Sequence, residues 1–470
     1  MRRSVLPTPP SPQTPLPGVA PTPESELDRI AAETGASRRR PRKFSCADLM
    51  RALVAVASGS RCCLSEIALR LSTAIEGTVS RQAVHARLDK LFVLFLCRAM
   101  GERIGRLHDR VGRPAAGIFS HFGRVLLQDS TCVALPPALA ARFPGASNQT
   151  GKTQAGMKVQ TVFDLKSDLY QSVGIDCFRR NDQAASPDIL AMLRPFDLVL
   201  RDLGYFVLPV FAEIAARGAY FLSRLRSDTV VIDPATGARL ELHQLLKGLD
   251  WLDISVLLGA GERLPARVVA CRVPPDVAAE RRRKANANRD RRSRPNAEKL
   301  ALLDWEIFVT NVPAIVWAAE TVCIVYAFRW RIEILFKTWK SFLRLTSLPQ
   351  NVSAVQAECL ALARIYHACE FHATVWQVAR HTLSTRGRHA SILRTIAVFH
   401  GPSERELLEL ASTNPEAFRE IVAKHCAYDK RKRLPFEAIF DLCATGPGAA
   451  PAGLPIGGAE CHGHATRAIA

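Results

Sequence analysis

The sequence predicts an α/β protein in which a core of strands and helices lies between helical segments. Short apolar strand patterns between residues 124 and 222 alternate with helical patterns, which is the arrangement of an α/β core. Apolar residues in segments 44–122 and 351–440 recur every three or four positions, as on the buried face of an amphipathic helix. The chain of 470 residues is also long enough for roughly two to four folding units.

The composition is that of a protein with a hydrophobic core and a basic surface. Hydrophobic residues make up 48% of the chain, and no apolar run reaches the ~18 residues that a membrane-spanning helix needs. Prolines rather than an apolar stretch follow the first residues, so we expect no signal peptide and a soluble, cytoplasmic protein. The formal charge of +19 is typical of a nucleic-acid binder, although solvated cationic faces alone could also account for it.

The two ends of the chain have the composition of disordered segments. Residues 1–43 are rich in Pro, Ser and Thr and end in a basic run. We expect a disordered arm there, which either touches DNA phosphates or merely keeps the protein in solution. Residues 443–470 are rich in Gly, Ala and Pro and are expected to be a disordered tail. The thirteen cysteines have no regular spacing, which favours reduced, buried thiols over disulfides.

A helical domain is predicted over residues 44–122, and it contains a candidate DNA-contacting helix. Ser80 has a side chain suited to the N-cap of the helix that follows. That helix begins with Arg81 and Gln82 and continues through His85 and Arg87. Such side chains suit a recognition helix in the major groove of DNA. An ordinary exposed amphipathic helix is the alternative.

Two aspartates mark a candidate metal site in the predicted core. The predicted strands are 125–129, 157–164, 170–177, 196–202 and 219–222, with a helix over 207–216. Asp129 and Asp202 each end an apolar strand, where open α/β sheets place functional groups. Carboxylate oxygens suit Mg²⁺, and a pair of ions about 4 Å apart needs carboxylates from several elements. On their own, two aspartates at strand ends are a weak indication.

Residues 227–312 interrupt the predicted core. They contain strand-like stretches at 229–232, 253–258, 266–273 and 306–310, together with a very basic run that begins at Arg281. Because no core could bury so many arginines, that run is expected in a loop or in a solvated helix. A long helix is then predicted over residues 316–342, followed by a helical C-terminal region over 346–442.

The predicted helix 316–342 carries the most specific pattern in the chain. Four residues, Tyr326, Arg329, Glu333 and Lys340, follow one another at offsets of 3, 4 and 7. Within one helix these offsets place all four side chains on one face. A routine salt link from Arg329 to Glu333 explains that pair, but it does not require the tyrosine and the lysine in register.

The spacing of these four residues resembles the signature of the DDE transposases of bacterial insertion sequences, which have a ribonuclease-H-like catalytic core. Other blocks of the chain are similar to blocks of that family. They are Gln128-Asp129-Ser130-Thr131, Gly156-Met157-Lys158, Arg201-Asp202-Leu203-Gly204-Tyr205-Phe206, Phe221-Leu222-Ser223-Arg224-Leu225 and Thr310-Asn311-Val312-Pro313. The resemblance covers about residues 44–345, in the order that the family has.

The resemblance implies a fold and a chemistry. The fold would be α/β, with a ribonuclease-H-like core over 123–226 and 313–345 and a β-rich insertion over 227–312. A helical DNA-binding domain would precede the core, and a helical region would follow it. Asp129, Asp202 and Glu333 would bind two Mg²⁺ ions, for which Mn²⁺ could substitute. These residues would catalyse DNA cleavage and strand transfer in cut-and-paste transposition.

The resemblance also implies contacts with DNA. Tyr326, Arg329 and Lys340 would touch phosphates of the transposon ends near the cut, while Arg81 and Gln82 are the candidates for base contacts. Excision in this branch commonly passes through a hairpin with a flipped base stacked on a tryptophan. Trp305 is the best candidate for that role, although its register against Thr310 is uncertain by one residue and a core tryptophan is the alternative.

Finally, the resemblance implies partners. They would be the terminal inverted repeats of the element, the target DNA and a second copy of the chain in the synaptic complex, all at the nucleoid. Two other interpretations remain open. A different ribonuclease-H-like nuclease would need the three carboxylates but not the Tyr-Arg-Glu-Lys face. A domesticated, non-catalytic DNA-binding protein is the other, and the presence of all three acids argues against it.

Overall fold

The protein is represented by a computed structural model that describes most of the chain. The described residues are 22–37, 43–57, 63–110, 117–146, 154–287, 295–346, 352–400, 404–429 and 435–445. The expectations for residues 1–21, for the basic run beyond residue 287 and for the tail from residue 446 lie outside them. No described helix is both long and apolar enough to cross a membrane.

The chain divides into two compact units, which we call the helical unit and the sheet unit. The helical unit comprises residues 1–112 and 338–430, so it combines segments from both ends of the chain. The sheet unit comprises residues 113–337 and 431–470.

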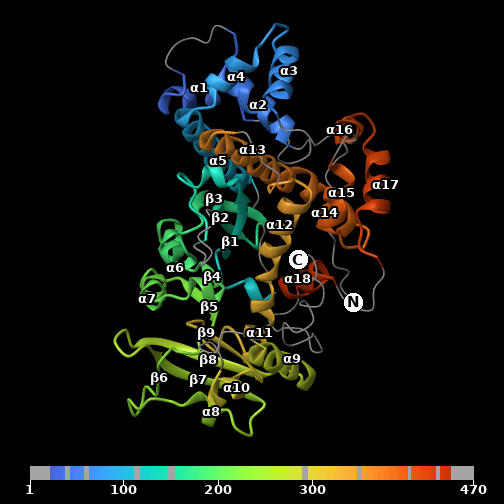
Figure 1. Ribbon diagram of the computed structural model, residues 1–470. Coiled ribbons are helices and arrows are strands. Elements are labelled where there is room, and N and C mark those ends of the chain that lie inside the picture. The colour runs from blue at the N-terminus through green and yellow to red at the C-terminus, as the bar shows by residue number, and fades with distance from the viewer. Residues whose placement is uncertain are drawn as a thin grey trace. The chain divides into compact units, whose positions relative to one another are not determined.

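The helical unit packs N-terminal helices against a central C-terminal one. Its helices are α1 (Glu24–Glu33), α2 (Cys46–Ala57), α3 (Leu64–Ala74), α4 (Arg81–Arg87), α5 (Lys90–Arg110), α13 (Ala354–Phe371), α14 (Gln377–Ser384), α15 (Ile392–Phe399), α16 (Glu404–Thr413) and α17 (Pro415–His425). A π-helical segment, His372–Trp376, joins α13 to α14. Helix α13 contacts both α2 and α5 (Figure 1). The helical character predicted for these segments is confirmed.

Two features of the N-terminal helices differ in how well the sequence predicted them. The N-cap role of Ser80 is confirmed, because its Oγ accepts a hydrogen bond from the Ala83 amide at 3.2 Å. The prediction that residues 1–43 are a disordered arm, in contrast, is wrong for the part of the segment that forms α1. Leu27, Ile30 and Ala31 recur at helical spacing and are buried, so α1 has an apolar face that packs against α2 and α5.

The sheet unit is built on one mixed sheet of nine described strands. They are β1 (Val125–Leu135), β2 (Ala155–Asp164), β3 (Leu169–Cys177), β4 (Leu198–Arg201), β5 (Tyr220–Arg224), β6 (Val231–Ile232), β7 (Trp251–Leu258), β8 (Leu264–Arg272) and β9 (Trp305–Thr310). The order in the sheet is β3-β2-β1-β4-β5-β9-β8-β7-β6. Strand β2 runs antiparallel to both of its neighbours, β1 and β3, whereas β4 and β5 run parallel to β1. The predicted α/β class is therefore confirmed.

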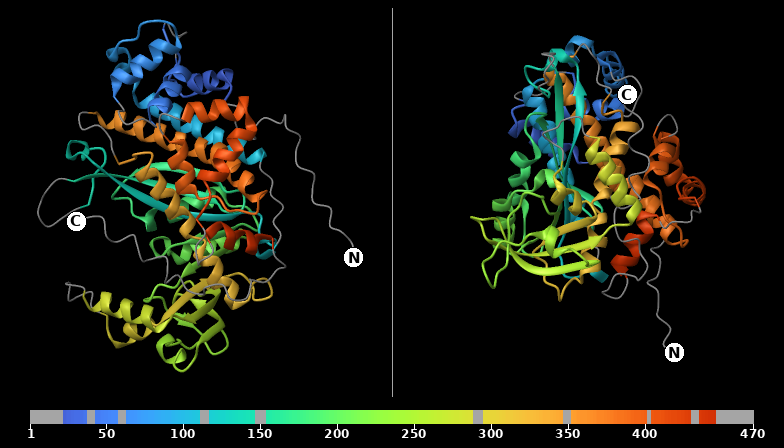
Figure 2. Two further views of the ribbon diagram at one scale, coloured as in Figure 1. Left: turned by 90° about the vertical axis from the view of Figure 1, so that its right-hand side faces the viewer. Right: turned by 60° about the horizontal axis from the view of Figure 1, so that its bottom comes forward.

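Helices lie on both faces of this sheet, as Figures 1 and 2 show. One face is covered by α6 (Asp182–Ala185), by the 3₁₀ segment Ser186–Met192 and by α7 (Leu208–Ala216), whose Phe211 and Ile214 join the hydrophobic core. The other face carries α11 (Ala319–Ala327), α18 (Phe436–Thr445) and residues 330–337 of α12 (Trp330–Ser341), whose last turn belongs to the helical unit. Phe328, next to α11, packs against Phe436 and Phe440 of α18.

The segment predicted as an insertion continues the sheet. Strand β9 pairs with β5 and with β8, so β6, β7 and β8 extend the sheet beyond the strands that precede them in the chain. Three helices accompany these strands: α8 (Leu242–Leu245), α9 (Pro275–Asn286) and α10 (Ala297–Leu302). The described part of the arginine run, residues 281–284, lies in α9. Arg283 is exposed, as expected for a solvated helix, whereas Arg281 is only 23% exposed and pairs with Glu306.

Candidate active site

The first two aspartates are brought together by the register of two parallel strands. Gln128 of β1 pairs with Arg201, the last residue of β4, and Asp129 and Asp202 are the next residues along. Asp202 ends its strand as expected. Asp129 does not, because β1 continues to Leu135 through its antiparallel pairing with β2. Asp129 therefore lies where β1 stops pairing with β4, and this position brings it beside Asp202 as a strand end would.

A buried arginine, Arg201, joins β4 to β1 on the face of the sheet that carries α6 and the 3₁₀ segment. Arg201 donates hydrogen bonds to Gln128 Oε1 at 2.6 Å and to Ser186 Oγ at 2.7 Å. Burial, without a carboxylate partner among these acceptors, lowers the pKa of Arg201 to about 9. Because side chains alternate along a strand, Asp129 points to the other face, where α11 and α12 lie. The hydrogen bonds of Arg201 thus tie β4 to β1 directly before both aspartates.

The third carboxylate approaches from α12 and meets Asp129 through an arginine. Arg329 Nη1 lies 3.2 Å from Asp129 Oδ2, and its Nη2 lies 2.7 Å from Glu333 Oε1. The Arg329 side chain is 10% exposed, against 15% for Asp129 and 33% for Glu333. The pair predicted as a routine helix salt link is therefore a buried bridge between two of the three acids.

The tyrosine of the signature reaches the remaining acid. Tyr326 Oη lies 3.4 Å from Asp202 Oδ1, and the Tyr326 side chain is buried. Its ring packs against Phe308 of β9, with ring centroids 4.9 Å apart. Burial raises the pKa of Tyr326, so its hydroxyl keeps its proton at neutral pH and can donate it in a hydrogen bond.

The prediction of one continuous helix through the signature is wrong. Helix α11 ends at Ala327 and α12 begins at Trp330, with a turn at Phe328 and Arg329 between them. Amides in this turn bond to carbonyls three residues back, for example Arg331 to Phe328 at 3.0 Å. The side chains of Tyr326, Arg329 and Glu333 therefore converge from two helices and a turn, and not from a single helical face.

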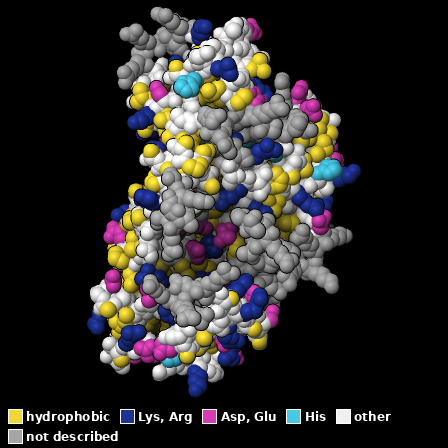
Figure 3. All heavy atoms as spheres, in the orientation of Figure 1, with side chains coloured by type: hydrophobic (Ala, Val, Ile, Leu, Met, Phe, Trp, Pro, Cys, Tyr) yellow, Lys and Arg dark blue, Asp and Glu magenta, His cyan; other side chains and the backbone are white. Residues whose placement is uncertain are grey.

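The electrostatics of the site favour a cation among the acids. Burial raises the pKa of Asp129 to about 7, with smaller contributions from Asp202 and Glu333 and an opposing one from Arg329. Burial alone would lower the pKa of Arg329, but the neighbouring tyrosine and the three carboxylates outweigh burial and raise it. Figure 3 shows acidic side chains gathered beside Lys and Arg side chains near the middle of the face drawn.

The three carboxylates have the donor chemistry that a hard divalent cation needs, because oxygen ligands suit Mg²⁺. Among the described residues, however, no three His, Cys, Asp or Glu side chains lie close enough together to hold an ion. The Arg329 guanidinium stands between Asp129 and Glu333 and provides positive charge there. An ion bound by both acids would require Arg329 to move away from at least one of them.

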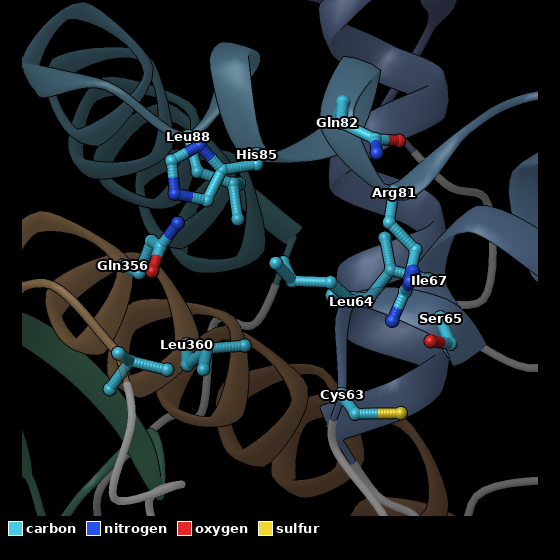
Figure 4. Close-up of a pocket in the computed structure, with 11 residues that line it drawn as sticks. Cys63, Leu64, Ser65, Ile67, Arg81, Gln82, His85, Leu88, Gln356 and Leu360 are labelled. Atoms are coloured by element: carbon cyan, nitrogen blue, oxygen red, sulfur yellow. The ribbon is translucent and has the colours of Figure 1, made fainter.

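The other predicted site residues lie outside this cluster. Lys340 is exposed near the end of α12, two turns beyond Glu333. Arg81 and Gln82 are exposed in the first turn of α4, in the helical unit. Figure 4 shows both beside a pocket that also borders His85 and Gln356. Their exposure leaves them available to a ligand, as a recognition helix requires.

Trp305 lies in the core, which is the second of its two predicted alternatives. Its side chain is 7% exposed and belongs to the hydrophobic cluster around Phe221 and Val268. The next residue of β9, Glu306, points to the opposite face and contacts Arg224. Sequence reasoning missed Glu306, because one position along a strand exchanges the two faces of the sheet.

The comparison with known families decides what kind of protein this is. A family profile described as "Transposase DDE domain" matches residues 120–367, more than half of the chain, and the match includes all three acids. The chain belongs to the DDE transposase family. It is an enzyme that cleaves DNA and transfers DNA strands, and the resemblance found in its sequence is confirmed.

Relatives of this DDE transposase carry insertion-sequence names. The transposase for insertion sequence element IS231D of Bacillus thuringiensis subsp. finitimus is 29% identical, over 80% of this chain and 82% of the relative. The transposase for insertion sequence element IS1151 of Clostridium perfringens is 22% identical, over 73% and 76%. Among solved structures, piggyBac transposase in a synaptic complex with hairpin DNA matches 88% of this chain and 84% of that one, with 11% identity and a TM-score of 0.39.

Proposed function

We propose that this DDE transposase excises and reinserts an insertion sequence, with Asp129, Asp202 and Glu333 as its catalytic carboxylates. One observation supports this assignment above the others. Residues of the Tyr-Arg-Glu-Lys signature contact both strand-borne aspartates, since Arg329 meets Asp129 and Tyr326 meets Asp202. Residues that were linked only by their order in the sequence thus share one site in the sheet unit.

We also propose that the core is ribonuclease-H-like. Three antiparallel strands followed by two strands parallel to the first, in the order β3-β2-β1-β4-β5, support this proposal. In this proposal the strands β6, β7 and β8 and the helix α9 form the β-rich insertion between the second and third acids. The insertion shares the sheet with the core through β9.

The metal proposal is that the three acids hold Mg²⁺ when DNA is bound. Bound there, the ions would activate the attacking oxygen and stabilise the leaving one. The chain itself positions these groups: Asp129 and Asp202 sit on a rigid sheet, and Glu333 on a helix packed against it. The charge of Arg329, released from Asp129, is then free to pair with a DNA phosphate, to which a guanidinium can donate two parallel hydrogen bonds.

The remaining signature residues are proposed to grip the transposon end. Tyr326 would donate from its protonated hydroxyl to a phosphate, and exposed Lys340 would act as a point charge further along α12. Arg81 and Gln82, on the exposed side of α4, would contact bases of the terminal inverted repeat. Trp305 is buried in the core and is therefore not placed to stack on a flipped base. We assign no stacking residue for a hairpin intermediate.

The proposed partners are DNA and a second copy of the chain. The names of the relatives, which are transposases of insertion sequence elements, support terminal inverted repeats and a target DNA as substrates. Two ends must be cut and joined in one complex, which favours a homodimer. The charge of +19 supports binding to DNA phosphates in both roles.

A cleavage assay tests this function. Purified full-length protein is incubated with duplexes that carry either terminal inverted repeat of its own element, with Mg²⁺, with Mn²⁺ or with a chelator. We expect metal-dependent cuts at the junction between the repeat and the flanking DNA, followed by joining to a target plasmid. Cutting without preference for the repeat would support the general nuclease instead. Specific binding without any cutting would support the non-catalytic derivative.

A further inference from the structure

A second charged cluster lies beside the proposed catalytic site, in the sheet unit. Glu306 of β9 accepts a hydrogen bond from Arg224 of β5 at 2.8 Å and another from Arg281 of α9 at 2.7 Å. Both arginines use the same oxygen, Oε1. The Glu306 side chain is 4% exposed, whereas Arg224 and Arg281 are 34% and 23% exposed. The carboxylate is therefore inside, and the two guanidiniums reach outward from it.

The charge of this cluster does not cancel. Two guanidinium groups share one carboxylate, so the cluster keeps a net charge of +1. Among the described residues, Glu306 is the hydrogen-bond acceptor found for Arg224, and the Arg224 Nε has none. A guanidinium has five N–H donors. The Nε of Arg224 is buried and one terminal N–H binds Glu306, so the other terminal N–H groups of this partly exposed side chain are those that a ligand with several acceptor oxygens could use. A DNA phosphate is such a ligand.

The cluster is connected to the catalytic acids by direct contacts. The Arg224 guanidinium lies 5.6 Å from the centre of the Tyr326 ring, and Arg329 lies 5.9 Å from the centre of the same ring. Arg224, Glu306, Tyr326 and Arg329 line one small pocket. Because Tyr326 also reaches Asp202, a phosphate held by Arg224 would lie next to the proposed catalytic site.

We propose that Arg224 and Arg281 form a phosphate-binding site for the transposon-end strand next to its cleavage point, and that Glu306 is the positioning residue that aims both arginines. A carboxylate that binds two guanidiniums at once reduces the number of rotamers that each side chain visits. The pair then meets DNA with less ordering left to occur. Arg281 also donates to the carbonyl oxygen of Trp305 at 3.2 Å, which holds α9 against the first residue of β9. This inference rests on the proposed function.

A chemical double-mutant experiment tests the inference. Full-length wild type and the variants Arg224→Gln, Arg281→Gln and Glu306→Gln are titrated with duplexes that end in the element's terminal repeat. In each duplex one phosphate near the cleavage point is replaced by a neutral methylphosphonate. For wild type, we expect one substitution to weaken binding about tenfold or more, the size of a hydrogen bond to a charged group. Arg217→Gln, from exposed Arg217 after α7, is the matched control.

The pattern across the variants decides the outcome. Arg224→Gln and Arg281→Gln should lose the wild-type penalty at that phosphate and keep the penalties elsewhere, and Glu306→Gln should reduce it. The control should keep every penalty. If both arginine variants retain the full penalty at each phosphate, or if only Glu306→Gln retains it, the inference is wrong. Failure of wild type to bind and cut the repeat would instead refute the proposed function.

Discussion

Arg329 and Asp129 are 200 positions apart in the chain, yet Nη1 of the arginine lies 3.2 Å from Oδ2 of the aspartate. The same guanidinium reaches Glu333 at 2.7 Å, so one side chain bridges the first and third proposed catalytic acids. The Arg329 side chain is only 10% exposed, so its contact with Glu333 is not the solvent-exposed salt link of an ordinary surface helix. Without metal, Arg329 supplies the positive charge that these acids need.

The bridge predicts that Arg329 stabilises the metal-free protein. Replacement by Gln leaves partly buried carboxylates without their counter-charge, a loss that costs about 3 kcal/mol where it is complete. We expect Arg329→Gln to lower the melting temperature in chelator and to regain much of it with Mg²⁺. Arg329→Lys should recover stability more than cleavage, because a lysine ammonium restores the positive charge but cannot donate two parallel hydrogen bonds as a guanidinium does. Equal loss with and without Mg²⁺ would show that Arg329 does not stand in for a cation.

Lys340 is predicted to act on DNA and not on folding. It is exposed near the end of α12, so Lys340→Ala should leave the melting temperature unchanged. If Lys340 contacts one phosphate, the slope of log affinity against log salt should fall by about 0.9. The control is Lys247→Ala, which removes an exposed lysine beyond α8. An unchanged slope, measured by fluorescence anisotropy, would remove Lys340 from the proposed DNA contacts.

A buried ion triad holds α12 in the sheet unit. Arg331 Nη2 lies 3.0 Å from Asp168 Oδ1, and its Nη1 lies 2.9 Å from Glu437 Oε1 of α18, with all three side chains at most 4% exposed. Arg331→Met removes the guanidinium that both buried carboxylates contact and should cost about 3–5 kcal/mol in unfolding free energy. Arg180→Met, which removes two more exposed ion pairs, to Asp176 and to Asp188, should cost no more than about 1 kcal/mol. Similar urea midpoints for the two variants would contradict this account.

The helical unit should lose stability in mild acid because of His367 in α13. Burial, and to a smaller extent the nearby His400, lowers the pKa of His367 to about 4. The unfolded chain, with an ordinary histidine pKa near 6.5, then binds the proton more tightly than the folded one. Stability should therefore fall as the pH decreases from about 6.5 towards 4. His367→Gln should flatten this dependence in melting experiments, and an unchanged slope would exclude His367 as its source.

The sequence predicted strands and helices well where the pattern is local. The alternation of apolar residues located β2 and β3 to within two residues, and the Ser80 cap located α4. It could not predict where β1 ends, because the polar run Gln128-Asp129-Ser130-Thr131 interrupts the apolar pattern, whereas the strand continues past it by pairing with β2. Pairing partners are not visible in the pattern of a single strand.

The break between α11 and α12 is a second case in which distant contacts decide. Nothing in the segment around Phe328 is a helix breaker such as Gly or Pro. Phe328 packs against Phe119, Phe436 and Phe440, which come from near the start of the sheet unit and from its last helix. The turn therefore depends on segments that lie about 100 residues or more away along the chain. It is this turn that allows Arg329 to reach Asp129.

We propose that Asp129, Asp202 and Glu333 act together as catalytic carboxylates. The most direct test of this proposal is single-turnover cleavage of a terminal-repeat duplex by Asp129→Asn, Asp202→Asn and Glu333→Gln. Glu213→Gln, from an exposed position on α7, is the control. We predict that the three site variants lose metal-dependent cleavage while they bind the repeat with nearly wild-type affinity, since affinity comes mainly from Lys and Arg on phosphates. Cleavage by Glu333→Gln near the rate of the control would contradict the assignment.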